Sequence, residues 1–261
     1  VSRHGVGYDN VDVEACTRNG IVVSITETAN AQAVSEHAFA CMLALSNKIV
    51  AADAGIRRGE WERAAYVGAE MHGKVLGIFG LGRIGSRVAR QAAAFGMEVV
   101  ACDPYVDPAQ AAGLGAKLVT ADTLLDRADY VTLHLPFSVA THHLIGAPEL
   151  AAMKPTAFLV NTSRGGIVDE GAVCAALRAG RLAGAALDVF EQEPVSSDHP
   201  LHELENLLLC SPHVAGQSEE SMVRMSLHAA ENILRVFRGQ PPSFTVNPEV
   251  LSDTSRVTWQ R

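Results

Sequence analysis

A glycine-rich stretch at residues 75–85 decides the fold class of this chain. It reads Val75-Leu76-Gly77-Ile78-Phe79-Gly80-Leu81-Gly82-Arg83-Ile84-Gly85. The apolar run 75–79 predicts a buried strand, and the GxGxxG pattern after it is typical of a turn that leads directly into a helix. Gly80 permits the tight turn, Gly82 lets the backbone approach a pyrophosphate, and Gly85 lets the helix pack on the strand. Because N–H groups at a helix start attract anions, this stretch predicts a diphosphate site.

A second predicted strand, at 98–102, ends in an acidic residue, Asp103, which lies 18 residues after Gly85. A carboxylate at this place accepts hydrogen bonds from both hydroxyls of an adenosine ribose and repels a 2′-phosphate. The two features together predict NAD as the cofactor, in preference to NADP. A simple turn residue before Pro104 is the alternative interpretation of Asp103.

Short apolar runs alternate with stretches of helical spacing along most of the chain. Strands are predicted at 21–25, 75–79, 98–102, 117–119, 130–133, 157–160, 183–187 and 207–210. Helices are predicted between them at 83–95, 122–127 and 169–179. Several of the strands are apolar on both faces, as parallel strands covered by helices are. The repeated order therefore predicts an α/β fold with a doubly wound parallel sheet, a Rossmann-like dinucleotide-binding domain.

Two longer helices are predicted at 31–57 and 219–238, with Ser218 as the N-cap of the second. The first is apolar around much of its circumference, whereas a surface helix usually has one polar face. We therefore expect a second subunit to cover part of it in a twofold homodimer. Coverage of the sheet edge by the same helix is the alternative. The apolar residues that support the dimer prediction are Phe39, Met42, Leu43 and Leu45.

Composition excludes several classes of protein. The 261 residues are 48% hydrophobic and 19% charged, with a formal net charge of −8. This charge argues against a nucleic-acid or anionic-membrane partner, since either would need a basic face. The longest unbroken apolar run, 38–45, is too short to cross a bilayer. Five scattered cysteines without a CxxC pair predict core residues in a reducing, cytoplasmic compartment: Cys16, Cys41, Cys102, Cys174 and Cys210.

Further motifs make the resemblance to one family specific. In chain order, the motifs are GVGYDN at 5–10, the glycine turn at 80–85, HLP at 134–136, NTSRGGIVDE at 161–170, ALDVFEQEP at 186–194 and SPHVAG at 211–216. With them the chain resembles the D-isomer-specific 2-hydroxy acid dehydrogenases over essentially its whole length. The resemblance implies an NAD-binding domain at 28–216 and part of a substrate domain at 1–27 plus 217–261. We expect most of the substrate domain to be missing, because the family carries a further α/β stretch before residue 5.

The resemblance implies that Arg164, Glu193 and His213 carry the chemistry, and the chemistry is coherent by itself. A 2-hydroxy acid has a carboxylate and a hydroxyl that must lose a proton as hydride leaves its carbon. A guanidinium such as that of Arg164 pairs well with a carboxylate. Imidazole exchanges protons near neutral pH, so His213 can take the hydroxyl proton. Glu193 can orient the imidazole and stabilise its charged form.

Other binding residues follow from the same resemblance. Asp188 is expected to contact the nicotinamide carboxamide, and Pro136 to line the adenine side. Backbone N–H groups of Val6 and Gly7 are expected to hold the substrate carboxylate, with Asn30 helping to order that loop. The remaining expected cofactor contacts are Arg83, Ile84 and Gly216.

Two histidine-containing pairs have zinc-like spacing, His199-x-x-His202 and Cys210-x-x-His213. We expect no metal, because the strand predicted between the pairs would separate them and a zinc site needs converging ligands. The predicted function is NAD-dependent hydride transfer with a small 2-hydroxy or 2-oxo acid of the 3-phosphoglycerate, glycerate–hydroxypyruvate or glyoxylate type. The alternatives are an NAD(H)-sensing binding module of the corepressor type and an inactive dinucleotide-binding fragment.

Overall fold

The computed structural model describes residues 1–204 and 207–252. The contacts within the chain divide it into two compact units. The larger unit comprises Val34–Ala215, and the smaller comprises Val1–Ala33 together with the chain from Gly216. The division predicted from the sequence differs at residues 28–33 and at Gly216, which lie in the smaller unit.

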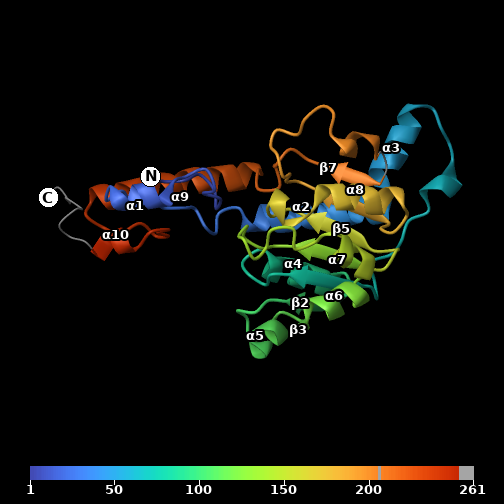
Figure 1. The fold of residues 1–261 in the computed structure, drawn as a ribbon, viewed down its shortest axis with the longest axis horizontal. Coiled ribbons are helices and arrows are strands. Elements are labelled where there is room, and N and C mark those ends of the chain that lie inside the picture. The colour runs from blue at the N-terminus through green and yellow to red at the C-terminus, as the bar shows by residue number, and fades with distance from the viewer. Residues whose placement is uncertain (205–206, 253–261) are drawn as a thin grey trace. The chain divides into compact units, whose positions relative to one another are not determined.

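The larger unit is built on a parallel sheet, and its strands follow the order β3-β2-β1-β4-β5-β6-β7 within the described residues (Figure 1). The strands are β1 (Val75–Phe79), β2 (Glu98–Cys102), β3 (Ala116–Leu118), β4 (Tyr130–Leu133), β5 (Phe158–Asn161), β6 (Gly184–Leu187) and β7 (Leu208–Cys210). The predicted doubly wound α/β class is confirmed. The predicted strands of this unit are each found to within a residue at either end.

The strand order reverses between β1 and β4, which are neighbours in the sheet although β2 and β3 separate them in the chain. Open α/β sheets bind ligands outside the carboxyl ends of their strands at such a reversal. Phe79 and Leu133, the last residues of β1 and β4, are paired in register. The glycine turn after Phe79 therefore starts at the edge where this fold binds its ligands.

Helices cover both faces of the sheet, and alternate residues of each strand pack against them. Leu76 and Ile78 belong to one buried cluster with residues of α2, α4 and α5. Phe79 belongs to the opposite cluster with residues of α6, α7 and α8. This alternation follows from the two-residue period of a strand. The helices of the larger unit that follow β1 are α4 (Gly85–Ala94), α5 (Pro108–Gly113), α6 (Ala121–Arg127), α7 (Ala147–Ala152) and α8 (Glu170–Arg178).

The predicted helix 31–57 is wrong as a single element. It is two helices, α2 (Ala31–Ser46) and α3 (Ile49–Arg57), with a bend of 61° between them. Lys48 separates them with φ of 52°, a left-handed conformation that an α-helix cannot continue through. Within the described residues no single helix is long and apolar enough to cross a bilayer. The pair α2 and α3, taken together, reaches that length and hydropathy but is bent.

The apolar side chains of α2 are covered by the chain's own sheet. Phe39, Met42 and Leu45 are buried in the cluster that contains Leu76 and Ile78. Three of the four side chains cited for the dimer prediction are therefore covered within the chain itself, and the dimer stays a prediction. The alternative interpretation, coverage of the sheet by the helix, is the one that the structure supports.

The smaller unit contains α1 (Val13–Arg18), α9 (Glu219–Phe237) and α10 (Glu249–Ser252). Ser218 caps α9 as predicted, because its Oγ accepts a hydrogen bond from the Ser221 N–H at 3.1 Å. The predicted strand 21–25 is wrong, since Ser24 makes only isolated bridges with Ser2 and Thr245. A single bridge on each side does not extend into the ladder that a strand needs.

Candidate active site

The glycine turn lies between β1 and α4. Gly80 has φ of +89°, which favours glycine, and its N–H donates to the Cys102 carbonyl at 3.0 Å. A Cβ added to Gly85 would lie 1.9 Å from the Gly80 carbonyl oxygen, whereas a Cβ on Gly82 would meet no heavy atom within 4 Å. The turn is therefore closed where the helix packs on it and open at Gly82, where a phosphate would approach. This geometry fits a dinucleotide pyrophosphate.

Asp103 contacts this turn directly. Its Oδ2 accepts a hydrogen bond from the Leu81 N–H at 2.8 Å, and its Oδ1 accepts one from the Tyr105 N–H at 2.9 Å. The carboxylate thus ties the end of β2 to the glycine turn and also caps its own turn. The structure brings Asp103 and Gly80–Gly85 together as the sequence predicted. Of the two other predicted pyrophosphate residues, Arg83 is exposed and Ile84 is half-buried at the start of α4.

Arg164 follows β5 and is half-buried. The buried Asn161 side chain fixes this loop, since its Nδ2 donates to the Arg164 carbonyl at 2.8 Å and its Oδ1 accepts from the Ser163 N–H at 3.0 Å. The Arg164 guanidinium donates from Nη1 to the Ser163 carbonyl at 2.7 Å. The Asn161 side chain therefore fixes the backbone from which the Arg164 side chain extends.

Glu193 and His213, the predicted orienting group and the predicted base, contact each other in the structure. Glu193 Oε2 lies 2.9 Å from His213 Nδ1, and Glu193 Oε1 accepts from the Phe190 N–H at 3.1 Å. One carboxylate oxygen is thus held by the backbone and the other holds the imidazole. The two side chains are 39% and 50% exposed, so the pair is open to a ligand. Because Nδ1 faces the carboxylate, Nε2 is the ring atom that can exchange a proton with a substrate.

His213 has φ of 55°, a left-handed conformation that costs a residue with a side chain about 1–2 kcal/mol. Its N–H donates to the Asp188 carbonyl at 2.8 Å. The Asp188 carboxylate, only 1% exposed, accepts from the N–H groups of Val214 and Ala215, each at 2.9 Å. Asp188 therefore bonds the backbone at His213 and at the two residues after it. Its contact with a nicotinamide carboxamide stays a prediction.

The predicted substrate loop lies in the smaller unit. Val6 and Gly7 are half-buried, and the Gly7 carbonyl accepts from Arg3 Nε at 3.0 Å. Gly216 belongs to the same unit, where a Cβ on it would lie 3.0 Å from Nδ2 of Asn30. Asn30 therefore packs against Gly216 within this unit. The substrate and cofactor contacts expected of Val6, Gly7 and Gly216 stay predictions.

Pro136 is exposed, as a residue lining the adenine side would be, and its carbonyl accepts from Thr141 Oγ1 at 2.8 Å. His134, in the same motif, lies 3.1 Å from Thr132 Oγ1 through Nε2. Desolvation by burial lowers the pKa of His134 to about 3. His134 is therefore neutral at physiological pH. Its backbone lies against the glycine turn, since a Cβ added to Gly80 would lie 2.5 Å from the His134 carbonyl oxygen. We interpret it as a structural residue.

Two acidic residues for which the sequence predicts no role, Glu170 and Glu191, support the Glu193 segment. The Glu170 N–H donates to Glu191 Oε1 at 3.1 Å, and the Glu191 N–H donates back to Glu170 Oε1. His199 Nε2 lies 3.0 Å from the other oxygen of Glu170, and burial is the main cause that raises the pKa of this carboxyl. The reciprocal bonds join the start of α8 to the segment that carries Glu193. Both residues lie in quoted motifs, but no local pattern indicated that the two motifs touch.

The histidines with zinc-like spacing have other partners. His199 contacts Glu170, His202 Nε2 lies 3.1 Å from the Ser196 carbonyl oxygen, and His213 contacts Glu193. Cys210 is exposed at the end of β7. Among residues 1–204 and 207–252, no group of three or more His, Cys, Asp or Glu side chains is placed to hold a metal ion.

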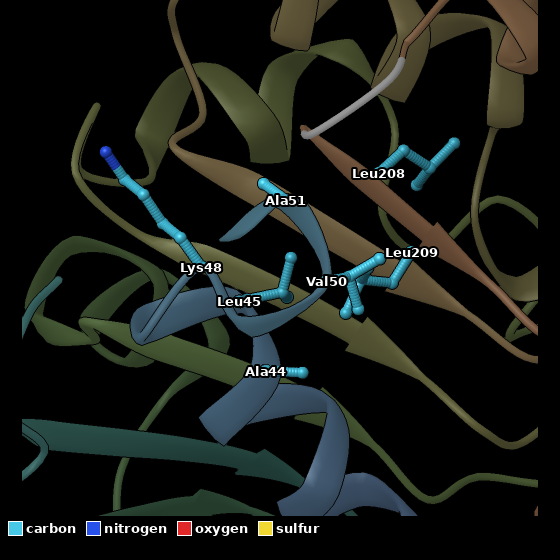
Figure 2. A pocket seen from close by; sticks show the side chains of 7 residues that line it. All are labelled: Ala44, Leu45, Lys48, Val50, Ala51, Leu208 and Leu209. Carbon is cyan, nitrogen blue, oxygen red and sulfur yellow. The ribbon is translucent and has the colours of Figure 1, made fainter. Parts of the chain in front are cut away.

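A hollow of about 50 Å³ lies between α2, α3 and β7. Figure 2 shows the side chains that line it. Leu45, Val50 and Leu209 line it, with Lys48 at its rim. None of its lining residues belongs to the glycine turn or to the predicted catalytic set. The hollow is therefore separate from the residues that are predicted to carry the chemistry.

The fold and these contacts define a dinucleotide-binding domain of the Rossmann type. Residues 39–215 match the family model described as "D-isomer specific 2-hydroxyacid dehydrogenase, NAD binding domain". The chain belongs to the D-isomer specific 2-hydroxyacid dehydrogenase family. This confirms the resemblance identified from the sequence motifs.

Relatives with assigned activities lie within this family. A D-3-phosphoglycerate dehydrogenase of Archaeoglobus fulgidus is 43% identical over 247 residues, which cover 95% of this chain and 47% of that protein. A glyoxylate reductase of Korarchaeum cryptofilum is 43% identical over 255 residues, which cover 96% of this chain and 76% of that protein. The chain therefore spans about half the length of the phosphoglycerate dehydrogenases that it matches.

Solved structures agree with the fold. The D-lactate dehydrogenase of Aquifex aeolicus, complexed with NAD and lactic acid, has a TM-score of 0.87 and 28% identity, over 94% of this chain and 79% of that one. A glyoxylate reductase of Paecilomyes thermophila has a TM-score of 0.86 and 35% identity, over 94% of this chain and 74% of that one. Both similarities extend over nearly the whole of this chain.

Proposed function

We propose that this chain carries the hydride-transfer machinery of an NAD-dependent oxidoreductase that acts on a small D-2-hydroxy or 2-oxo acid. The observation that supports it most is the Glu193–His213 pair, 2.9 Å apart. Arg164, Glu193 and His213 follow β5, β6 and β7, which are adjacent in the sheet. A guanidinium for a carboxylate and an oriented imidazole for a hydroxyl proton are the two groups that this substrate class needs.

In the oxidation direction, the roles divide as follows. The Arg164 guanidinium binds the substrate carboxylate, and His213 Nε2 accepts the proton of the hydroxyl group as it becomes a carbonyl. Glu193 stabilises the imidazolium that results, and its bond to Nδ1 keeps Nε2 pointed at the substrate. Bound NAD would supply the nicotinamide that accepts the hydride from the substrate carbon. Reduction reverses these steps, with His213 Nε2 returning the proton to the alkoxide oxygen.

NAD fits the residues at the glycine turn better than NADP does. The space beside Gly82 admits a pyrophosphate, and Asp103 lies against the same turn. A carboxylate there bonds ribose hydroxyls and repels a 2′-phosphate. We assign the cofactor contacts to Gly80, Gly82, Gly85 and Asp103.

Oxidation of NADH with glyoxylate, hydroxypyruvate and phosphohydroxypyruvate tests the activity. We expect turnover with at least one of them, and a loss of at least about 100-fold in kcat for His213→Ala, because general acid–base catalysis contributes about that much. Affinity for NADH should change little, since the glycine turn and Asp103 hold the dinucleotide. His228 is exposed on α9, and His228→Ala is the matched control. Binding of NADH without turnover on all three acids would refute the enzyme and favour the binding module or the inactive fragment.

We further propose a homodimer, on grounds that differ from those in the sequence. Apolar side chains lie exposed on α3 and in the segment after it, where Ile56 is 55% and Trp61 79% exposed. Ile49, Val50 and Val67 in the same part of the chain are each more than half exposed. Exposed apolar groups gathered in one region favour a protein partner, and a second copy is the simplest one.

Sedimentation tests the dimer. We expect twice the chain mass of 27.7 kDa at micromolar concentration, and a monomer for Ile56→Glu with Trp61→Glu. Val139→Glu, at a 98% exposed position in the loop after β4, is the control. A monomeric native chain would refute the proposal.

We propose a reducing, cytoplasmic location, supported by the state of the cysteines. All five have free thiols, one of them buried and one exposed. Burial raises the pKa of Cys41 to about 11, so this thiol is a poor nucleophile. Alkylation of the native protein in cell extract, followed by mass spectrometry, should find no disulfide. An intramolecular disulfide in freshly prepared protein would contradict the proposal.

A further inference from the structure

A chain of hydrogen bonds runs from α2 to the loop that carries His213. His37 Nε2, on α2, lies 3.1 Å from Ser211 Oγ, and Ser211 Oγ donates to Asp188 Oδ1 at 2.6 Å. Because the Ser211 hydroxyl donates its proton to the Asp188 carboxylate, the Ser211 oxygen accepts a hydrogen bond from the His37 imidazole. This direction requires the tautomer, or the charged form, in which His37 Nε2 carries a hydrogen.

The chain ends on the carboxylate that holds the catalytic loop. Asp188 Oδ1 accepts from the Val214 N–H as well as from Ser211, and Oδ2 accepts from the Ala215 N–H. The Asp188 backbone carbonyl accepts from the His213 N–H. Asp188 thus bonds the backbone N–H of His213 and those of the two residues that follow it. Asp188 is itself bonded by Ser211, which accepts from His37 on α2.

Burial makes this support necessary. The Asp188 side chain is 1% exposed, and a carboxylate removed from water needs hydrogen-bond donors in its place. The imidazole of His37 lies near this carboxylate, with Nε2 3.8 Å from Oδ1. His37 is itself mostly buried, with 26% of its side chain exposed. It therefore faces a carboxylate that water reaches poorly.

We propose that His37 is a positioning residue that fixes the His213 loop through Ser211 and Asp188. The proposal rests on the proposed function only for its consequence in catalysis. Loss of the His37 donor leaves Ser211 free to rotate away from Asp188, so the carboxylate loses a donor and the loop at 213–215 opens more often. The His213 imidazole then spends less time in the position set by Glu193.

Amide hydrogen exchange in the chain without cofactor tests the proposal directly. In His37→Leu, the Val214 and Ala215 amides should exchange about tenfold faster, as expected for the loss of one hydrogen bond to a charged group. The amides of Val131 and Leu133 in β4 serve as reference, because they report global unfolding. Equal acceleration at both places would mean a general loss of stability and would overturn the proposal.

A conservative variant separates positioning from simple packing. His37→Gln retains a donor nitrogen and should restore slow exchange at Val214 and Ala215, whereas Ser211→Ala should reproduce the acceleration. In the Ser211→Ala background, His37→Leu should add little, because the connection is already broken. The proposal is wrong if these amides exchange as fast in His37→Gln as in His37→Leu. It is also wrong if the accelerations caused by His37→Leu and Ser211→Ala add in the double variant.

Turnover then tests the consequence. We expect kcat with the best 2-oxo acid to fall about tenfold in His37→Leu and to recover in His37→Gln, with the dissociation constant for NADH unchanged within twofold. His228→Leu is the control for replacing a histidine. The exchange measurement needs neither cofactor nor turnover, so it decides the role of His37 even if the native chain reduces none of the acids. Faster loop exchange with unchanged kcat would refute the link to catalysis.

Discussion

Gly85→Ala should destabilise the chain, although alanine is the better helix former. The new Cβ would lie 1.9 Å from the Gly80 carbonyl oxygen and 3.0 Å from its carbon. Because both atoms belong to backbone, the start of α4 must move away from the glycine turn by about 1 Å, a shift of the kind that overpacking forces. That shift disturbs Val88 and Ala89, which are fully buried against the sheet. Overpacking of about 3 kcal/mol then exceeds the helix-propensity gain of about 1 kcal/mol.

The net loss of about 2 kcal/mol should lower the apparent Tm by about 4–8 °C in scanning calorimetry. Gly82→Ala is the matched control, because its Cβ would enter open space. We expect the Tm of Gly82→Ala to stay within about 2 °C of the native value, since surface changes are worth within about 0.5 kcal/mol. Its dissociation constant for NADH should nevertheless rise at least about tenfold, because the methyl group occupies the space left for the pyrophosphate. An unchanged Tm for Gly85→Ala, or unchanged NADH binding by Gly82→Ala, would refute the reasoning about this turn.

Three further predictions follow from single residues. Asp103→Ala should weaken NADH binding and narrow the preference for NADH over NADPH, because it removes hydroxyl acceptors and a repulsive charge; an unchanged ratio of the two dissociation constants would contradict the assignment. His134, with its pKa lowered to about 3, should stay neutral in the folded chain while the unfolded chain binds a proton below pH ~6.5. Stability should therefore fall as the pH drops from about 6.5 toward 3, and His134→Gln should flatten this fall in urea titrations. Glu170→Ala should lower kcat about tenfold, since it removes the acceptor of the Glu191 N–H beside the Glu193 segment; a native kcat would count against that support.

The sequence alone predicted the class of fold and the main site because both depend on local patterns. GxGxxG requires a turn and a helix start within six residues, so Gly80, Gly82 and Gly85 carry their meaning without any distant partner. The apolar strands β1 to β7 could likewise be recognised one at a time. Arg164 and His213 each follow such a strand, and this alone placed them at one edge of the sheet.

The predicted helix 31–57 shows what a local sequence pattern cannot predict. The sequence predicts one helix over 31–57, because Asn47 and Lys48 do not break a helix by composition. The left-handed conformation of Lys48 and the bend of 61° between α2 and α3 are seen only in the tertiary structure. The apolar character of Phe39 and Met42 was correct, but only the tertiary structure decided that the sheet covers them.

The support of the active site was also decided by tertiary structure alone. Asp188 follows β6 and was predicted to touch the cofactor, yet its buried carboxylate holds Val214 and Ala215. His37 reaches the same carboxylate through Ser211 from 174 residues earlier in the chain. A buried charge takes whatever donors the folded chain brings to it, and residue spacing does not record which donors these are. The sequence therefore predicted which groups react, and the tertiary structure determined what holds these groups in place.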